Sequence, residues 1–167
     1  MVRSDVKLWQ TRHLTLEVQR FAVPRDLPVM ICGDFNSEPT SAVHEFLSTG
    51  AIANSRNYPE LEVEDGGVRV LARDLRTITH GMELASAMST VIGREPTFTN
   101  YTAKFKGTLD YIWYTPSLLR VMAGANMPDQ HELISVSGKG AGLPCVSYPS
   151  DHISLCCDVA MVNAPLQ

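Results

Sequence analysis

The chain has 167 residues, of which 44% are hydrophobic and 19% charged, and its net charge at pH 7 is −4. This length suffices for one domain with a sizeable core, and the composition excludes a largely disordered chain. The negative charge gives no overall attraction to nucleic acids or anionic membranes. Any polyanion must therefore be held by a local cationic patch or by metal ions.

The cysteines and the hydropathy pattern indicate a soluble protein of a reducing compartment. The four cysteines form no C-x-x-C pair, so we expect reduced thiols and no zinc knuckle. The first residues lack the apolar core of a signal peptide, and no apolar run approaches the ~20 residues of a membrane-spanning helix. We expect the protein in the cytosol or the nucleus, without a membrane partner.

The first predicted element is a helix over residues 4–22. Ser4 suits its cap, Asp5 suits its first turn, and Pro24 ends it. A broad apolar stripe is expected to face the core, and it consists of Val6, Trp9, Leu14, Leu16, Val18 and Phe21. His13 lies near this stripe and receives no role, because a lone histidine on a helix is more often packed or solvated than a ligand.

A buried strand is predicted next, over residues 28–32. Its apolar residues run into Gly33, and the strand would deliver Asp34 and Asn36 to its exposed end, which is how active sites are built. The alternative is an ordinary Asx-type turn, since Gly, Asp, Asn, Ser and Pro are also common turn residues.

A second helix is predicted over residues 40–48, with Gly50 as its stop and with Val43, Phe46 and Leu47 turned inward. Helix, buried strand and helix in this order indicate an α/β or layered α+β domain. The acidic residues at 60–65 favour a solvated loop over a metal site, because alternate carboxylates without a rigid scaffold seldom chelate. A short helix over 83–90 follows.

The next predicted feature is a hairpin of residues 97–102 and 108–114, joined by residues 103–107. Asp110 stands out within it, because a carboxylate among buried strand residues is costly unless something satisfies it. A structural hydrogen bond would satisfy Asp110, and so would a histidine that Asp110 orients.

The last part of the chain is predicted to contain two strands around an irregular region. One strand covers 117–122, and residues 124–148 carry too many Pro, Gly, Ser and Asp for regular structure. The other strand covers 153–159 and directly follows Asp151 and His152.

Polar side chains thus lie at three predicted strand ends. They are Asp34 with Asn36, then Asp110, and finally Asp151 with His152. Such a set suits metal-assisted phosphoester hydrolysis, in which carboxylates hold Mg²⁺ and position water while Asn and His donate to phosphoryl oxygens. No serine lies in a nucleophile elbow and no P-loop is present, which argues against serine hydrolysis and P-loop chemistry.

The order of G-D-F-N, L-D-Y and S-D-H, at residues 33–36, 109–111 and 150–152, resembles the endonuclease/exonuclease/phosphatase superfamily. The runs at 4–11 and 99–107 are similar to poly(A) deadenylases of the carbon-catabolite-repressor type. The resemblance implies a four-layer α/β/β/α sandwich with mostly antiparallel sheets. Residues 1–167 would then form the C-terminal half of the catalytic domain.

The resemblance also implies roles for single residues. Asp34 would help to activate the attacking water, and Asn36 would contact the scissile phosphate. Asp110 would orient His152, which contacts the phosphate as well, while Asp151 would lie beside the metal centre.

Two further positions match residues that handle the adenine base in that family. These are Asn100 and Phe105. Stacking gives a physical reason for the aromatic residue, since every base offers a π-face worth about 1–3 kcal/mol. The alternative for Phe105 is a hydrophobic side chain packed at the tip of the hairpin.

The leading hypothesis is an Mg²⁺-dependent 3′–5′ exoribonuclease that removes poly(A) tails from mRNA. Its partners would be poly(A) RNA and a deadenylase scaffold complex bound through regions that this chain lacks. Because the metal-binding glutamate of the family precedes the matched region, we expect little turnover from this chain alone and an exposed apolar sheet face prone to association. The alternatives are a nucleotide or lipid phosphatase of the same superfamily, and a non-catalytic truncated product that binds RNA or protein.

Overall fold

A computed structural model describes residues 4–52 and 78–162, and between them Tyr58, Leu61 and the segments 64–65 and 68–69. The helical elements are α1 (Ser4–Ala22), η1 (Val23–Arg25), α2 (Ala42–Thr49), α3 (Ala87–Ile92) and α4 (Gln130–Ser137). The strands are β1 (Met30–Asp34), β2 (Glu64–Asp65), β3 (Val68–Arg69), β4 (Ala85–Ser86), β5 (Asn100–Tyr101), β6 (Lys106–Gly107), β7 (Asp110–Tyr114), β8 (Leu119–Gly124) and β9 (Cys157–Met161).

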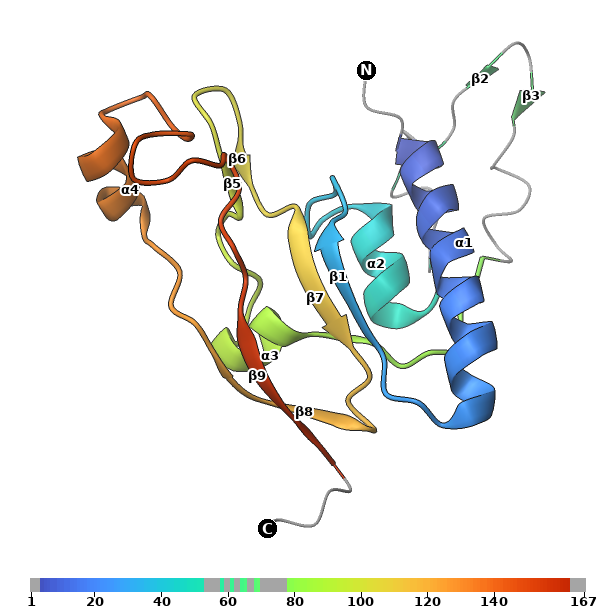
Figure 1. The fold of residues 1–167 in the computed structure, drawn as a ribbon. Helices are drawn as coiled ribbons and strands as arrows, with labels where there is room; N and C mark the ends of the chain where they lie inside the picture. The colour runs from blue at the N-terminus through green and yellow to red at the C-terminus, as the bar shows by residue number, and fades with distance from the viewer. Residues whose placement is uncertain are drawn as a thin grey trace.

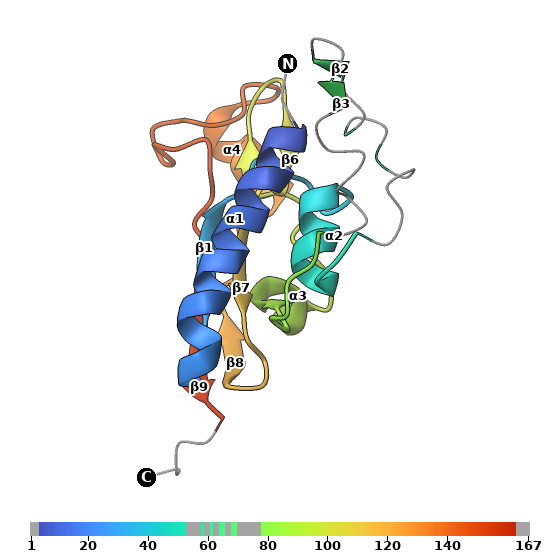
Figure 2. The same cartoon turned by 90° about the vertical axis from the view of Figure 1, so that its right-hand side faces the viewer.

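The centre of the fold is an antiparallel sheet with the strand order β1-β7-β4. Helices α1 and α2 lie on one side of this sheet, and the β8–β9 pair lies on the other (Figure 1). Figure 2 shows α1 and α2 side by side in front of β1 and β7. The result is a layered α/β arrangement with antiparallel strand pairs, as the sequence predicts.

Both faces of β7 are buried because each packs against a different layer. Tyr111 and Trp113 join the core beneath α1 and α2, together with Phe46. Ile112 and Tyr114 join a second core with α3 and β8. Packing on both faces therefore supports β7, and the first residue of β7 is Asp110.

Helix α1 has the predicted bounds, but the predicted apolar stripe is wrong. Most of its members are exposed, with exposed fractions of 39% for Val6, 54% for Trp9, 41% for Leu14 and 62% for Phe21. The buried face instead contains Leu8, Thr11 and Thr15. The two threonine hydroxyls donate to carbonyl oxygens of their own helix, so their burial leaves no unpaired donor. No helix among the described residues is long and apolar enough to cross a bilayer.

Helix α2 confirms the prediction for its region closely. The Ser41 hydroxyl accepts from the His44 amide at its start, and Gly50 ends it with φ +79°. Val43, Phe46 and Leu47 are buried, as expected. Local capping signals and apolar spacing therefore suffice for this helix.

Strand β1 begins two residues later than predicted and is buried on one face only. Ile31 is buried, whereas Met30 is 40% exposed and Cys32 is exposed. The bounds of β1 are set by its pairing with β7, because the register runs from Met30 opposite Tyr114 to Asp34 opposite Asp110. Exposed apolar side chains also occur on β9, at Val159 and Met161. The expected association through such residues stays a prediction.

The predicted hairpin of 97–102 with 108–114 is wrong in its pairing. The hairpin is shorter, since Asn100 pairs with Gly107 and Tyr101 with Lys106. Strand β7 leaves the hairpin and pairs with β1 and β4 in the central sheet. Strands β1 and β4, which are remote in the sequence, thus pair with the two edges of β7, and the local alternation of residues does not reveal such pairing.

Several other boundaries differ from the prediction. Helix α3 starts at Ala87 rather than residue 83, because the two residues of β4 pair with β7 first. Strand β8 begins at Leu119, and β9 covers Cys157–Met161 rather than 153–159. Within the predicted acidic loop, Glu64 and Asp65 form β2, which pairs with β3. The rest of that loop lies outside the described residues.

Helix α4 corrects the expectation of irregular structure over 124–148. The Asp129 carboxylate accepts from the Glu132 amide and caps the helix. Leu133 anchors it with no exposed surface. The aspartate three residues before a glutamate was the available signal, and the surrounding Gly and Pro residues obscured it.

Candidate functional site

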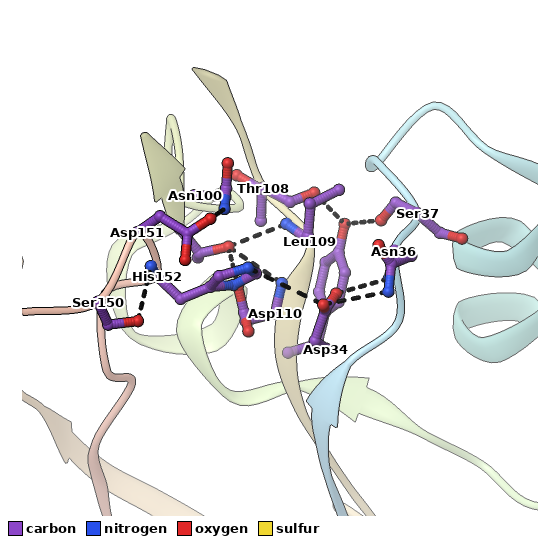
Figure 3. Close-up of polar contacts among 12 residues, drawn as sticks. Asp34, Asn36, Ser37, Asn100, Thr108, Leu109, Asp110, Ser150, Asp151 and His152 are labelled. Carbon is purple, nitrogen blue, oxygen red and sulfur yellow. Dashed lines mark hydrogen bonds and ion pairs between the residues drawn. The ribbon is translucent and has the colours of Figure 1, made fainter. Parts of the chain in front are cut away.

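The site is built on the meeting point of β1 and β7. Asp34 ends β1 and lies opposite Asp110, which begins β7. Directly paired residues of antiparallel strands project on the same face, so both carboxylates are on one side of the sheet (Figure 3). The predicted delivery of Asp34 to a strand end is therefore observed.

Asn36 is fixed to Asp34 by a tight turn. Its backbone amide donates to Asp34 Oδ1 at 2.7 Å, and its side-chain Nδ2 donates to Oδ2 at 3.1 Å. Asn36 adopts φ +48°, a left-handed conformation that asparagine tolerates better than most residues. The Lys7 ammonium on α1 also donates to the Asn36 carbonyl. The Asx turn considered from the sequence is thus part of the site rather than an alternative to it.

His152 lies between the two aspartates (Figure 3). Its Nδ1 is 2.8 Å from Asp110 Oδ2, and its Nε2 is 4.0 Å from Asp34 Oδ2. Since a carboxylate only accepts, Nδ1 carries the proton in this hydrogen bond. The pairing of Asp110 with a histidine, one of the two options open from the sequence, is observed, and the other option, a structural hydrogen bond, is observed as well.

The segment around His152 is held in place by the β5 region. Tyr101 N donates to Asp151 O at 3.0 Å, and Ile153 N donates to Thr99 O at 2.7 Å. The Ser150 hydroxyl accepts from the His152 amide. Backbone pairing therefore positions the histidine although no regular strand includes it.

The environment of His152 raises its pKa above the ordinary histidine value. Partial burial alone would lower this pKa, but the hydrogen bond to Asp110 and the negative charges of Asp110, Asp34 and Asp151 outweigh it. The imidazolium is thus favoured where the carboxylates converge. A protonated His152 would present Nε2–H as a donor on the side of Asp34.

Asp151 and Asn100 complete the polar cluster. Asn100 is buried and donates through Nδ2 to Asp151 Oδ2 at 3.2 Å. Phe105 lies in the turn between β5 and β6, where it is 38% exposed and packs against Gly107. The structure gathers six of the predicted side chains into one network, and it leaves Phe105 as an exposed aromatic residue on the adjoining hairpin.

Sequence reasoning missed one member of this network. The Thr99 hydroxyl donates to Asp110 Oδ2 at 2.6 Å, and Thr99 has no exposed surface. In the sequence Thr99 looks like any β-prone residue of a strand. Only its place one residue before Asn100, within the matched run, could have drawn attention to it.

Comparison with known proteins identifies the family. The model of the Endonuclease/Exonuclease/phosphatase family matches residues 3–152, which include every member of the network. The chain belongs to this family.

Two curated relatives refine the placement within the family. The chain is 36% identical to "Carbon catabolite repressor protein 4 homolog 1" of Arabidopsis thaliana, over 91% of this chain and 27% of that protein. It is 37% identical to "CCR4-Not complex 3'-5'-exoribonuclease subunit Ccr4" of Phaeosphaeria nodorum, over 82% of this chain and 21% of that protein. The chain therefore spans roughly a quarter of the length of these family members.

A solved structure of the family supports the fold. The crystal structure of ANGEL2, a 2′,3′-cyclic phosphatase, in complex with adenosine-2′,3′-vanadate superposes with a TM-score of 0.67 and 25% identity. The match covers 93% of this chain and 52% of that chain. This similarity confirms the predicted α/β fold class.

Nucleases of the family generally depend on a divalent metal. Among the described residues, no group of three or more His, Cys, Asp or Glu side chains converges on one metal position. The carboxylates of Asp34 and Asp151 are hard oxygen ligands that lie on either side of His152 (Figure 3), and the Asp34 side chain is 34% exposed. Mg²⁺ commonly uses one or two carboxylates and completes its shell with water and substrate phosphate. These residues fit a partly hydrated Mg²⁺ rather than a closed protein cage.

Proposed function

We propose that this sequence belongs to an Mg²⁺-dependent 3′–5′ exoribonuclease that shortens poly(A) tails. The observation that carries the proposal is His152, bound to Asp110 through Nδ1 and turned toward Asp34 through Nε2. This geometry suits a donor to a phosphoryl oxygen beside a carboxylate that accepts a proton from water. Similarity to the fungal Ccr4 subunit supports the reaction type.

Each residue of the network has a defined task in this proposal. Asp34 accepts a proton from the attacking water, and Asn36, oriented by its bond to Asp34, uses its remaining amide hydrogen on the phosphate. Protonated His152 donates from Nε2 to a phosphoryl oxygen as negative charge builds there. Asp110 holds the imidazole in the required orientation. When bound, Mg²⁺ would be held by Asp34 and Asp151 and would neutralise phosphate charge.

The neighbouring residues would bind the substrate. Asn100 already donates to Asp151, so it is held at the edge of the network, where a nucleotide would lie. Phe105 offers an exposed ring on which a base could stack. Adenine is the proposed base, and poly(A) RNA the proposed partner.

The proposed setting is the cytosol or the nucleus, within a scaffold complex of deadenylases. The fungal relative is named as a subunit of the CCR4-Not complex, which supports this partner.

A second candidate function is a 2′,3′-cyclic phosphatase. The similarity to ANGEL2, which covers 93% of this chain, favours it. The same network would serve either reaction, because both need a water nucleophile and donors to phosphoryl oxygens. The two functions differ in their products.

The test uses 5′-labelled RNA with a 3′ A-tail and the full-length protein that carries this sequence, with Mg²⁺ or with EDTA. A ladder of shortened RNA that requires Mg²⁺ and disappears in Asp34→Ala supports the exoribonuclease. Asp158→Asn, a change of an exposed carboxylate on β9, is the matched control. The same RNA prepared with a 2′,3′-cyclic phosphate at its 3′ end tests the second candidate, which is supported by opening of that ring without shortening of the RNA. If the protein binds RNA but wild type and Asp34→Ala give the same products in the same amounts, both candidate functions are contradicted.

A further inference from the structure

The carboxylate of Asp110 receives two donors on a single oxygen. Oδ2 accepts from His152 Nδ1 at 2.8 Å and from the Thr99 hydroxyl at 2.6 Å. Rotation of a carboxylate about its terminal bond is soft, so one hydrogen bond alone leaves its plane free to turn. A second donor from the buried side fixes the oxygen that His152 uses.

The hydroxyl of Thr99 has its own orientation determined. Its oxygen accepts from the amides of Leu109 at 2.9 Å and Asp110 at 3.0 Å. A hydroxyl has two acceptor positions and a single hydrogen, so both acceptor positions are filled and the hydrogen is committed to Asp110. Because Thr99 has no exposed surface, water does not compete for this hydrogen.

The backbone of Thr99 holds the other side of the pair. Its carbonyl accepts from the amide of Ile153, the residue directly after His152, at 2.7 Å. Its amide donates to the Gly107 carbonyl at 2.9 Å, which ties Thr99 into the hairpin. One residue therefore sets the position of Asp110 through its side chain and of His152 through its backbone.

We propose that Thr99 is a positioning residue of this active site, which fixes the Asp110–His152 pair in the geometry needed for phosphate contact. The inference rests on the proposed function for its catalytic consequence and on the contacts of Thr99 for its structural content. Thr99 touches no reacting atom, so it acts through His152.

The expected effect is a loss of turnover without a loss of substrate binding. Removing a group that orients a functional side chain commonly lowers activity by about 10–100-fold. We expect this loss in kcat for Thr99→Val, which keeps the shape and removes the hydroxyl, with an unchanged KM. Thr99→Ser keeps the hydroxyl and should retain most of the wild-type kcat.

The experiment compares these two variants in the wild-type and His152→Ala backgrounds of the full-length protein, on 5′-labelled A-tailed RNA. If Thr99 acts through His152, Thr99→Val lowers kcat only where His152 is present. Thr108→Val is the matched control. Thr108 is buried like Thr99, and its hydroxyl also donates a hydrogen bond, but to the backbone carbonyl of Pro96 and not to Asp110. Equal losses in both backgrounds, or an equal loss in Thr108→Val, would overturn the inference and leave Thr99 a structural role.

A second measurement separates this inference from the proposed function. Proton NMR of the histidine ring follows the hydrogen-bonded Nδ1 proton of His152, whose signal is expected to persist in Thr99→Ser and to broaden or vanish in Thr99→Val. A wild-type protein that leaves RNA uncut contradicts the proposed function, and this signal still decides the role of Thr99. An unchanged signal in Thr99→Val overturns it.

Discussion

Asp34 and Asp110 are direct partners across β1 and β7, at the point where one strand ends and the other begins. Two carboxylates on one face of a sheet repel each other unless a cation or a donor lies with them. His152 supplies that donor, with one ring nitrogen toward each aspartate. The strand register therefore places two carboxylates together, and His152 supplies the hydrogen-bond donor that reduces their repulsion.

Replacement of Asp110 by Asn should lower the pKa of His152. The substitution replaces the charged acceptor of Nδ1 by a neutral one and removes one of the three negative charges that raise this pKa, while burial continues to lower it. An NMR titration of the histidine ring protons in metal-free protein measures the change. Asp158→Asn is the control, and a His152 pKa equal to that of wild type in Asp110→Asn would contradict the assignment.

The activity should decline as the pH rises through the pKa of His152. The protonated ring is the proposed donor, and Asp110 is one of the groups that raise its pKa in the metal-free protein. We therefore expect kcat to fall on the alkaline side of the pKa of His152, and this limb to move to lower pH in Asp110→Asn. A pH–rate profile on A-tailed RNA checks this, and a limb that ignores the substitution would exclude His152 as its source.

Acid should weaken the fold through His80. This residue is 8% exposed, its Nε2 lies 2.9 Å from the Phe46 carbonyl, and burial lowers its pKa despite hydrogen bonds to backbone carbonyls. The unfolded chain then binds the proton first, so the free energy of unfolding falls as the pH drops below about 6.5. Each unit of lowered pKa costs about 1.4 kcal/mol once both states are protonated.

Urea unfolding of wild type and His80→Gln at several pH values measures this effect. The variant should lose part of the acid sensitivity, whereas His13→Gln, on the exposed side of α1, should keep it. Identical pH slopes in wild type and His80→Gln would show that other groups cause the acid sensitivity.

Gly142 should tolerate alanine much less well than Gly140. Both have a positive φ, +70° and +80°, so either substitution costs about 1 kcal/mol of backbone strain. A Cβ on Gly142 would also lie 2.4 Å from the carbonyl carbon of Thr102, whereas Gly140 has open space. We expect a further loss of about 1–3 kcal/mol in Gly142→Ala, measured by urea unfolding. Equal losses in the two variants would contradict this close approach.

Local chemistry explains which parts of the fold the sequence predicts. The ends of α1 and α2 follow from Pro24, Ser41 and Gly50, which act within one turn of the helix. The buried face of α1 was missed because Thr11 and Thr15 satisfy their hydroxyls within the helix and pack as apolar residues would. Hydropathy alone assigns such threonines to the surface.

The residues of the candidate site also fall into a group that the sequence predicts and a group that it does not. Asp34, Asp110 and His152 were predicted because each belongs to a short motif, and the structure brings all three together. The partners of β7 were not predictable, since they come from β1 and β4 and depend on the whole sheet. Thr99 was missed because its importance lies in the three hydrogen bonds of its hydroxyl, which no sequence pattern records.

The dependence of His152 on backbone pairing with the β5 region has a consequence for the order of folding. Asp34 and Asp110 come together when β1 pairs with β7, but the histidine arrives only when a segment about fifty residues after Asn100 has docked. During synthesis from the N-terminus, the two carboxylates are made before the histidine that they share. The proposed arrangement of Asp34, Asp110 and His152 would thus be complete only after this last segment has docked.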